Sequence, residues 1–546
     1  MNETALDDER PQPPHSPREV DDRTARVLET VAAGPLPGFL HTRRWFGAKG
    51  REIARVRPLD HAELVPASPG RPAYVLAIFD VAYRDGEREA SDVYAIPLVI
   101  GTGGSGGADS VIGEIRIDDA SVTIGDALAD ERFARALLAA IARNSVIETA
   151  QGGALVGKAA THFAGVIGGG AIEDLPARVL RAEQSNTSLV FAAGGNDRVI
   201  MKCLRRLAEG VGLEVEIGAH LGRVGFRGTP AMLGDLSYLP RAHAQQAGPM
   251  TLAIAQQFVA NAGDGWAHAV SDVRVRLESH YRSSRPSREP YDVAIRSLGR
   301  LTGEMHLALA ADRRSPELAP EPLTEDDRNG LAIAAATRLV ELVAYVERSA
   351  SAWSDELRVV ARSVIEHAPL FAERLRKARL PAGLVKTRIH GDFHLGQVLR
   401  IHDEASVGWT IVDFEGEPAR PLAERRAKSS PLKDVAGMLR SFDYAAFAGI
   451  RDVLQDERDA TRRGEIEADA ARWRESARAA FLDGWLSVST RAELSMVPTD
   501  ATARAEALEL FELEKALYEL TYEIENRPDW VGIPLRGIGR LIERRR

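Results

Sequence analysis

The stretch from Ile389 to Leu399 places a histidine, an aspartate and a glutamine at short, fixed spacing. His390 lies two residues before Asp392, and Gln397 follows Asp392 by five residues. An apolar, strand-like run then ends at Asp413. A carboxylate can orient a hydroxyl group and accept its proton, and Mg²⁺ binds oxygen ligands such as carboxylates and amides. If the loop folds back beside the strand, these residues favour phosphoryl transfer, with Asp392 as the base and Gln397 and Asp413 as Mg²⁺ ligands.

The order and spacing of these residues are those of a protein-kinase-type catalytic loop, H-x-D-x-x-x-x-N, followed by a D-F-G-like metal site. Here Gln397 stands at the asparagine position, and Asp413 is followed by Phe414 and Glu415. The alternative is an aspartate-rich loop and a strand end that are both solvated. A single H-G-D motif is common by chance, but three elements in this order are much rarer. We therefore favour the catalytic interpretation.

A kinase also needs a cation for the α- and β-phosphates, usually a strand lysine that is held by a helix glutamate. Lys202 lies in the strand-like run R-V-I-M-K-C-L, and Glu214 and Glu216 follow at a plausible distance. The alternative is an edge-strand lysine that faces water. We favour Lys202 as the phosphate-binding lysine, with Glu216 or Glu214 as its partner.

Two further segments are predicted to contact the nucleotide. A polar turn upstream of Lys202 stands where kinases place the hairpin loop over the phosphates, and its donors would come from Ser185, Asn186, Thr187 and Ser188. Taken alone this signal is weak, because polar turns are common. The run from Leu252 to Val259 is interpreted as the strand and hinge beside the adenine, with Gln257 and Val259 near the hinge. Recognition there uses backbone groups, so the side chains leave the nucleotide preference open.

Two glycine-rich stretches imitate nucleotide-binding loops. Gly101 to Gly106 matches G-x-G-x-x-G, but the residues after it alternate like a strand. The fingerprint instead needs a helix whose free N–H groups bind pyrophosphate. Gly152 to Lys158 matches the start of a P-loop, but Ala159 lacks the hydroxyl that would bind Mg²⁺. We interpret the first as a linker and reject the second as a P-loop.

The elements that must position these residues follow from hydrophobic periodicity. One helix is predicted between Asp126 and Arg143, because Phe133, Leu137, Leu138 and Ile141 share a face. Helical patterns dominate from Pro290 onward. Strand-like runs are found at Ala73–Phe79, Val93–Ile100, Ser188–Ala192 and Val199–Cys203, with a β-rich island between Lys386 and Phe414.

Length and composition bound the class of protein. A chain of 546 residues is long enough for roughly three to four folding units, and 45% hydrophobic residues suffice for buried cores. The net charge of −9 argues against a protein that mainly grips nucleic acid or an anionic membrane. The single cysteine, Cys203, excludes an intrachain disulfide framework, and no apolar run suits a membrane span or a secretory signal. We therefore expect a soluble, cytoplasmic protein of several domains that binds neither nucleic acid nor membrane.

With these residues in place, the sequence resembles the bacterial maltokinases, including the maltokinase part of trehalose synthase fusions, within the aminoglycoside-phosphotransferase-like kinases. The resemblance runs from RRWFGAKG at Arg43–Gly50 to NRPDWVGIPLRGI at Asn526–Ile538. Its most specific blocks are EQSNTS, HGDFHLGQVL, YELTYEIENRPDW and DFEGEPARPLAERRAKSSPLKDVAGMLRSFDYA. The last block, Asp413–Ala445, is too long for coincidence.

The resemblance implies transfer of the ATP γ-phosphate to the anomeric hydroxyl of maltose. The product would be maltose 1-phosphate, which feeds α-glucan and glycogen synthesis from trehalose. The resemblance carries the roles given above to Asp392, to the two metal ligands and to Lys202 with Glu216, and it adds Glu415 as an assisting residue at the metal or the sugar.

The resemblance also implies an α+β, bilobal, protein-kinase-like fold with a β-rich N-terminal cap subdomain, a β-rich N-lobe and a mostly helical C-lobe. We expect a disordered tail at residues 1–25 and the cap at 26–110. An intermediate subdomain and the kinase N-lobe are expected at 111–260, and the C-lobe with the catalytic loop and the sugar site at 261–546.

The sugar site is predicted on the last long helix pattern. Carbohydrate sites commonly combine an aromatic face with carboxylates and amides for the hydroxyls. Tyr518 and Tyr522 are four residues apart and so share one helix face. The predicted acceptor site comprises Tyr518, Tyr522, Glu523, Asn526, Arg527 and Trp530, together with His390, Asp392, His394 and Glu415. The alternative is a helix that packs its aromatic side chains into the core.

Three functions are weighed on this basis. The first is a maltokinase that uses ATP and Mg²⁺, and the second is a kinase of the same fold that acts on another sugar, such as glucosamine or an aminoglycoside. The third is a catalytically silent sugar-binding or regulatory partner of trehalose synthase. The presence of Lys202, Asp392, Gln397 and Asp413 together speaks against silence, because decayed kinases commonly lose at least one such residue.

Overall fold

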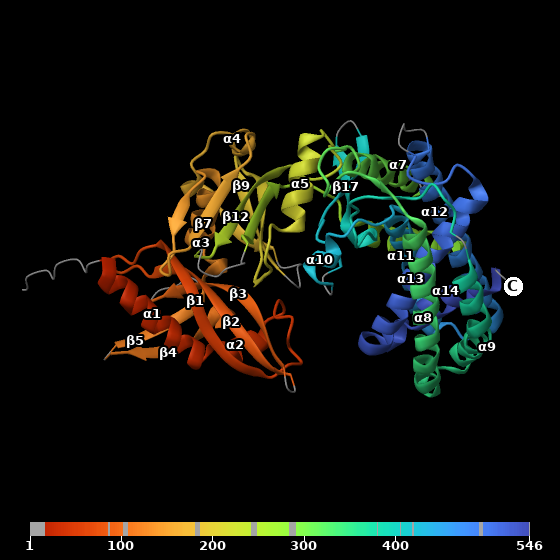
Figure 1. Ribbon diagram of the computed structural model, residues 1–546, viewed down its shortest axis with the longest axis horizontal. Coiled ribbons are helices and arrows are strands. Elements are labelled where there is room, and N and C mark those ends of the chain that lie inside the picture. Colours follow the sequence, from red (N-terminus) through yellow and green to blue (C-terminus); the bar gives the residue numbers. More distant parts are fainter. Residues whose placement is uncertain are drawn as a thin grey trace, which may run out of the picture. The chain divides into compact units, whose positions relative to one another are not determined.

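The structure, a computed structural model, contains two compact units (Figure 1). The described residues are 17–85, 88–101, 108–118, 120–180, 186–241, 248–282, 291–378, 380–403, 406–417, 420–490 and 495–544. The β-rich unit comprises Met1–Val215 and Met232–Phe258, and the helical unit comprises Glu216–Ala231 and Val259–Arg546. Helix α5 (Leu213–Arg223) begins in the first unit and continues in the second.

The first part of the β-rich unit is a six-stranded antiparallel sheet. Its strand order is β1-β2-β3-β5-β4, and β11 pairs with β3. The strands are β1 (Ile53–Val65), β2 (Ala73–Asp85), β3 (Arg88–Ile100), β4 (Val111–Ile117), β5 (Ala120–Asp126) and β11 (Arg206–Leu207). Helices α1 (Pro17–Ala33) and α2 (Leu36–Thr42) pack against β1 and β4.

Strand β2 is apolar along most of its length because both of its faces are buried. Val75 and Phe79 belong to the core that α1 covers, whereas Tyr74 and Leu76 belong to a second core beneath α3 (Glu131–Ala142). Successive side chains of a strand point to opposite faces, so a strand between two cores is apolar throughout. This arrangement accounts for the uninterrupted run Ala73–Phe79.

The second part of the β-rich unit is a seven-stranded sheet with the order β6-β7-β12-β13-β10-β9-β8. Helix α3 begins after Asp130, whose carboxylate accepts the backbone N–H of Arg132, and packs Phe133 and Leu137 toward the sheet. The predicted helix is therefore confirmed. The strands are β6 (Val146–Glu148), β7 (Ala154–Ala159), β8 (Ala177–Leu180), β9 (Thr187–Ala193), β10 (Asn196–Cys203), β12 (Met232–Leu239) and β13 (Met250–Gln257), and a short helix, α4 (Phe163–Ile167), follows β7.

The P-loop-like stretch Gly152–Lys158 runs into strand β7 rather than into a helix. Gly157 is required there by packing, because a Cβ atom at this position would lie 2.0 Å from the backbone oxygen of Ala140 in α3. Its glycine therefore serves helix–strand packing, which agrees with the rejection of a P-loop. Most of the other glycine-rich stretch, residues 102–107, lies outside the described residues.

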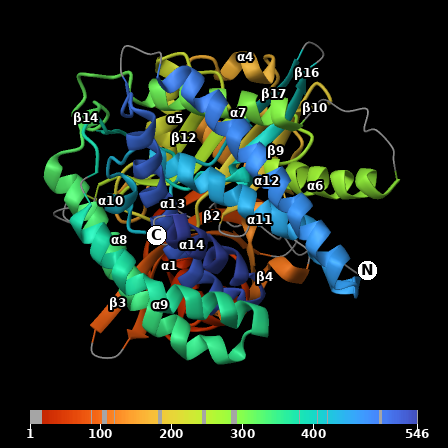
Figure 2. The same cartoon turned by 90° about the vertical axis from the view of Figure 1, so that its right-hand side faces the viewer.

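The helical unit consists of long helices and two small β-ribbons (Figure 2). Helix α7 packs along α12, α8 along α9, and α11 against α6, α12 and α13. The ribbons pair β14 (Glu321–Pro322) with β15 (Val385–Lys386) and β16 (Val398–Asp403) with β17 (Ser406–Ile411). The helices are α6 (Gly265–Arg282), α7 (Tyr291–Leu309), α8 (Glu325–Ser349), α9 (Asp355–Lys377), α10 (Leu422–Arg425), α11 (Leu432–Asp456), α12 (Ala460–Ser489), α13 (Ala501–Asn526) and α14 (Gly532–Arg544).

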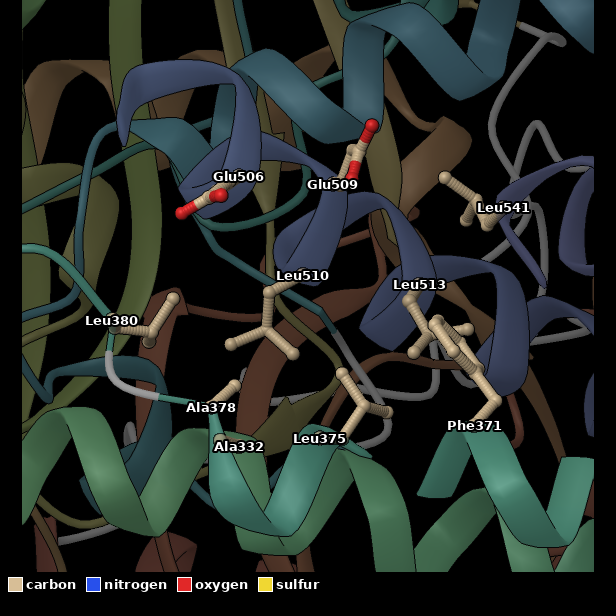
Figure 3. Close-up of a pocket in the computed structure, with 10 residues that line it drawn as sticks. All are labelled: Ala332, Phe371, Leu375, Ala378, Leu380, Glu506, Glu509, Leu510, Leu513 and Leu541. Carbon is tan, nitrogen blue, oxygen red and sulfur yellow. The ribbon is translucent and has the colours of Figure 1, made fainter. Parts of the chain in front are cut away.

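A small apolar pocket lies between α8, α9, α13 and α14 (Figure 3). Its lining includes Phe371, Leu375, Leu510 and Leu513, and its volume is about 30 Å³. A cavity of this size holds a water molecule or two. The pocket is a packing feature of the helical unit and not a site for a sugar.

Two features of the sequence differ in the structure from simple expectation. Helix α1 begins at Pro17, within the stretch 1–25 that was expected to be a disordered tail.

The segment Glu325–Ala352 is long and apolar enough to cross a membrane by length and composition. This is weak evidence for a membrane span, because the core helices of soluble proteins pass the same test. Its buried side chains, such as Leu339 and Leu342, face the helical unit. The proposed domain boundaries stay predictions.

Candidate active site

The catalytic loop is held by a buried aspartate from the first turn of α11. The Asp434 carboxylate accepts the backbone N–H groups of His390 at 2.8 Å and of Gly391 at 2.9 Å. The imidazole of His306 lies 3.1 Å from the same carboxylate. Burial alone would raise the pKa of Asp434, but the hydrogen bond from His306 and the nearby His390 lower it below its usual value. A buried anion therefore fixes the backbone of the loop from behind.

The side chain of His390 is buried and contacts the protein around the catalytic loop rather than a substrate. Its side chain is 0% exposed, its Nε2 donates to the backbone oxygen of Val412 at 2.9 Å, and its ring packs 4.8 Å from that of Phe414. The expected contact between His390 and a sugar is therefore wrong. Both ring nitrogens face the protein, and the residue ties the catalytic loop to the strand end that carries Asp413.

Asp413 stands at the end of β17 in a backbone conformation that few residues adopt. Its φ is 68°, in the left-handed region, where aspartate is enriched among non-glycine residues. Gly391 has a φ of 87°, and a Cβ atom there would lie 3.2 Å from the Cα of Gly416. The two glycines thus let the loop and the strand end approach closely.

The two predicted metal ligands are brought together by this approach. The side-chain amide of Gln397 donates to the Asp413 carboxylate at 3.0 Å. A carboxylate and an amide carbonyl are oxygen donors of the kind that Mg²⁺ takes beside phosphate oxygens. The donor set therefore fits Mg²⁺, and the role of Gln397 and Asp413 as metal ligands stays a prediction.

Asp392 lies in a cluster of charges that the sequence did not reveal. The Lys515 ammonium group from α13 lies 3.5 Å from the Asp392 carboxylate and 2.9 Å from that of Glu417. Burial alone would lower the pKa of Lys515, but Asp392 and Glu417 outweigh it and raise the pKa above its usual value. Conversely, burial would raise the pKa of Glu417, but Lys515 and Arg420 lower it to about 2. We call Asp392, Lys515, Glu417 and Arg420 the catalytic-loop cluster.

His394 and Glu415 lie next to these residues. The Nε2 atom of His394 is 3.9 Å from Asp392, and burial lowers the pKa of this histidine despite the nearby carboxylate. Its Nδ1 accepts the backbone N–H of Gly396 and so caps the short turn that leads to Gln397. The backbone oxygen of Glu415 accepts from the Arg425 guanidinium at 2.9 Å. Contacts of His394 and Glu415 with a substrate stay predictions.

The predicted phosphate-binding lysine lies in the β-rich unit and has a different partner from the one assigned. The Lys202 ammonium group is 3.3 Å from the carboxylate of Glu214, which also accepts from Gln256 at 3.1 Å. Glu216 instead pairs with Arg388 at 2.7 Å in the helical unit. Residues two apart on a helix do not share a face, so the choice of Glu216 is corrected to Glu214.

Comparisons with known proteins show which kinases this chain resembles. Residues 39–130 match the family model of the maltokinase N-terminal cap domain. A glucosamine kinase from Streptacidiphilus jiangxiensis is 29% identical over 359 residues, which cover 65% of this chain and 71% of that protein. One from Mycolicibacterium smegmatis is 27% identical, with 67% and 79% covered.

Solved structures of a glucosamine kinase are also similar. One, in complex with glucosamine, ADP and inorganic phosphate, has a TM-score of 0.60 at 23% identity and covers 94% of this chain and 98% of its own. A second crystal form has a TM-score of 0.61.

The chain resembles the maltokinase-like kinases. The fold class expected from the sequence, an α+β kinase fold with a β-rich cap, is thereby confirmed, and the comparisons support a kinase.

The residues predicted to contact the nucleotide differ in how accessible their side chains are. Ser185 lies outside the described residues, and Asn186 and Thr187 are half-buried at the start of β9. Ser188 is 0% exposed and pairs with Lys202 across the β9–β10 ladder. A fully buried strand hydroxyl cannot reach a phosphate, so the assignment of Ser188 is wrong.

The predicted hinge residues follow strand β13. Gln257 ends the strand and is exposed, and the next residue, Phe258, donates its N–H to the backbone oxygen of Arg198 at 2.8 Å. The backbone oxygen of Val259 accepts from the side chain of Asn261 at 3.0 Å. Adenine recognition by Gln257 and Val259 stays a prediction.

The predicted sugar residues of α13 separate into two groups. Tyr518 belongs to the first, because Lys515 lies 5.2 Å from its ring centre and because burial and the adjacent Glu417 raise its pKa. Trp530 belongs to the second, since its ring stacks on that of Tyr444 at 6.0 Å. Only Tyr518 is thus tied by contact to the catalytic-loop cluster.

The other members of the set surround Trp530. The Arg527 guanidinium lies over the rings of Tyr522 and Trp530, at 5.3 and 5.5 Å from their centres. The side chain of Asn526 donates to the backbone oxygen of Tyr522 at the helix end. Glu523 is 1% exposed, and its carboxylate accepts from Tyr444 at 3.0 Å and from Arg527 at 2.6 Å. Direct contact of Glu523 with a sugar is therefore wrong, whereas roles for the other three residues stay predictions.

Two residues of the candidate site escaped the sequence-based prediction. Glu417 lies in the block DFEGEP and Lys515 lies one turn before Tyr518, but neither matches a kinase motif. The scarcity of lysine relative to arginine in this chain is the one signal that could have drawn attention to Lys515.

Proposed function

We propose that the protein is an ATP-dependent sugar kinase. The observation that carries this proposal is the arrangement of Asp392, Gln397 and Asp413, which one buried scaffold around Asp434 and His390 holds together. The comparisons support a sugar kinase, because two similar proteins are glucosamine kinases and because residues 39–130 match the maltokinase N-terminal cap domain.

In the proposed reaction Asp392 orients the acceptor hydroxyl of the sugar and takes its proton. The acceptor oxygen then bonds to the γ-phosphorus, while the bond from that phosphorus to the β–γ bridging oxygen breaks and ADP leaves. Lys515 holds the Asp392 carboxylate in place and balances its charge in a site where water is largely excluded. Positioning of this kind supplies most of the catalysis in phosphoryl transfer.

Asp413 and Gln397 are the residues that would hold Mg²⁺. When bound, the ion neutralises charge on the transferring phosphate. Lys202, oriented by Glu214, would bind the α- and β-phosphates. Each of these groups is positioned by its own element: β17 for Asp413, the loop before β16 for Gln397 and β10 for Lys202.

We propose maltose as the acceptor, phosphorylated at its anomeric hydroxyl to maltose 1-phosphate for α-glucan synthesis. The match to a maltokinase cap and the motif blocks support maltose. Glucosamine is the second candidate and is equally supported, because both similar curated proteins and the solved structure with bound sugar are glucosamine kinases. Association with trehalose synthase and a cytoplasmic location stay predictions.

The test is a sugar panel with purified protein, ATP and Mg²⁺. ADP release is followed for maltose, glucosamine, glucose and an aminoglycoside, and the product is identified by phosphorus NMR, which distinguishes an anomeric from a primary phosphate ester. We expect turnover on maltose that stops when Mg²⁺ is removed with EDTA.

Each outcome of the panel points to one function. Turnover on glucosamine alone would move the protein to the glucosamine kinases. Binding of a sugar without ADP release from any member of the panel would contradict a kinase and favour a silent binding partner.

A further inference from the structure

The helical unit contains a large open cavity away from the catalytic loop. Its volume is about 1110 Å³, and it lies between η4 (Ala350–Ala352), the second half of α11, the first half of α12 and the start of α14. Helix α11 leads from Asp434, which holds the catalytic loop, to Arg451 at the cavity, a rise of about 25 Å. Asp392, Gln397 and Asp413 are not among the residues that line it. The cavity is therefore separate from the catalytic loop, although Pro528 and Asp529 of its lining adjoin the predicted sugar residues Arg527 and Trp530.

Arginine dominates the charged lining of this cavity. Six arginines but only four acidic residues line it, which leaves an excess of positive charge. Two of the acids are used in exposed pairs, Glu356 with Arg536 and Asp529 with Arg451. The arginines are Arg348, Arg451, Arg463, Arg474, Arg536 and Arg540.

A single buried carboxylate organises the inner wall. Asp443 is 6% exposed and contacts Arg440, with Arg540 at 3.2 Å and Arg474 at 3.4 Å from its oxygens. Arg440 is itself buried, whereas Arg474 and Arg540 line the cavity. One negative charge thus holds two guanidinium groups at the cavity wall and a third behind them. We call Arg440, Asp443, Arg474 and Arg540 the arginine cluster.

Arg540 is the least compensated arginine at this wall, because Arg440 also pairs with Glu519 at 2.8 Å. Burial, together with the neighbouring Arg474 and Arg440, lowers the pKa of Arg540 to about 10 against the attraction of Asp443. Arg474 also reaches Glu475 at 2.7 Å, but Arg540 has only the shared Asp443 among its ion pairs in the described part of the chain. An anion in the cavity would relieve this repulsion.

The remaining lining suits more than a bare ion. Trp353 and Phe447 contribute aromatic side chains, and the cavity is at least as large as the pockets of roughly 300–1,000 Å³ that hold small molecules. Aromatic faces pack against the C–H side of sugar rings, and arginine forks match phosphate oxygens in pairs.

We propose that this cavity binds a phosphorylated sugar, with the phosphate on Arg474 and Arg540 and the sugar ring against Trp353 or Phe447. The site is a binding site only, and the inference does not depend on which sugar the kinase phosphorylates. The shared chemistry is a phosphate monoester, which is offered by a sugar phosphate and, without the ring, by inorganic phosphate.

The test is titration calorimetry on the full chain, without ATP or Mg²⁺, using glucose 6-phosphate, inorganic phosphate and glucose as probes. We expect glucose 6-phosphate to bind, inorganic phosphate to bind at least tenfold more weakly, and glucose not to bind. Equal affinity for glucose 6-phosphate and inorganic phosphate would reject the sugar part of the proposal. Absence of binding by glucose 6-phosphate would overturn it entirely.

Matched variants locate the bound molecule. Arg540→Gln and Arg474→Gln should each weaken binding of glucose 6-phosphate at least tenfold. Arg472→Gln should leave binding unchanged, because Arg472 is exposed on α12 and pairs with Asp469 of its own helix. Loss of binding in Asp392→Asn, with binding retained in Arg540→Gln, would place the ligand at the catalytic loop and overturn the proposal.

A readout on the unaltered chain guards against variants that fail to fold. Trp353 lines the cavity, so glucose 6-phosphate should change the tryptophan fluorescence with the same dissociation constant as in calorimetry. The change should disappear in Trp353→Phe while calorimetric binding persists. A fluorescence change that survives in Trp353→Phe would contradict occupancy of this cavity.

Discussion

The helical unit contains two buried ionic clusters with opposite charge at their centres. In the catalytic-loop cluster the ammonium group of Lys515 lies between the carboxylates of Asp392 and Glu417, and Arg420 also pairs with Glu417. In the arginine cluster one carboxylate, Asp443, lies among several guanidinium groups. The lysine lowers the pKa of Glu417 and lies beside the proposed base, whereas the arginines around Asp443 are the groups that we propose to bind an anion. The difference agrees with our two proposals, a site for proton transfer at the catalytic loop and a binding site at the cavity.

The two clusters are joined by one helix. Lys515 and Glu519 are four residues apart on α13, and the carboxylate of Glu519 lies 2.8 Å from Arg440. Burial raises the pKa of Glu519 even though Arg440 and Lys515 oppose the shift. Arg440 in turn contacts Asp443, so an unbroken chain of charged groups connects the loop with the distant cavity.

The largest expected effect belongs to the carboxylate that we propose as the base. Asp392→Asn should lower turnover by about 10³-fold, because general acid–base catalysis contributes roughly 10²–10⁴ and a neutral amide cannot accept the proton. ADP release under saturating ATP and sugar measures the effect, and the thermal midpoint should stay close to that of the unaltered protein. Asp452→Asn, at an exposed position, is the matched control. Turnover within tenfold of normal in Asp392→Asn would remove Asp392 from its assigned role.

The residues of this first prediction were accessible from the sequence because they are close in the chain. Asp392 and Gln397 share one loop, Asp413 ends the next β-ribbon, and Lys202 lies in a strand of clear pattern. Local spacing and hydrophobic alternation are properties of short segments, so the sequence alone predicts them. The fold class and the helix α3 were predictable for the same reason.

The remaining features depend on contacts between distant segments. Lys515 is 123 residues from Asp392 in the chain, and no local pattern relates them. The choice between Glu214 and Glu216 depends on how helix α5 is rotated about its own axis. The local sequence does not determine that rotation for two glutamates that are only two residues apart. His390 was misassigned because a motif reveals the identity of a residue but not which way its side chain points.

The second prediction removes the central cation of the catalytic-loop cluster. Lys515→Met should destabilise the protein by about 2 kcal/mol, because buried Glu417 then keeps only Arg420 as a cation and Asp392 loses the ammonium group beside it. The pKa of Glu417 should rise, so the acidic limb of the profile of kcat/KM against pH should move to higher pH. Lys515→Arg should restore part of the stability and the position of that limb. An unchanged pH profile in Lys515→Met would separate Lys515 from the catalytic loop.

The control for this variant is Lys377→Met. Lys377 is largely exposed and pairs with Glu373 one turn away, and such pairs contribute only a few tenths of a kcal/mol. Stability and the pH profile should both stay as they were.

The third prediction concerns acid and tests the same cluster through Glu417. Its pKa is lowered from 4.5 to about 2 in the folded protein, so its stabilising contribution is fully present above pH 4.5 and is lost as the pH falls toward 2. The shift corresponds to about 3 kcal/mol. Urea unfolding measured between pH 5 and pH 2.5 should therefore show a shallower loss of stability in Glu417→Gln than in the unaltered protein. Parallel curves would contradict the assigned partnership with Lys515.

The smallest effect on the free energy of unfolding is expected in the arginine cluster. This prediction tests the comparison between the two ionic clusters most directly. Arg540→Gln removes a charge that its neighbours repel, while Asp443 keeps Arg440 and Arg474 as partners. Because the Arg540 side chain is 35% exposed, solvent screens much of that repulsion. The free energy of unfolding should therefore stay within about 1 kcal/mol of normal, with any change toward greater stability. A loss as large as that of Lys515→Met would mean that Arg540 is a structural partner of Asp443, and the contrast between a balanced and an unbalanced cluster would fail.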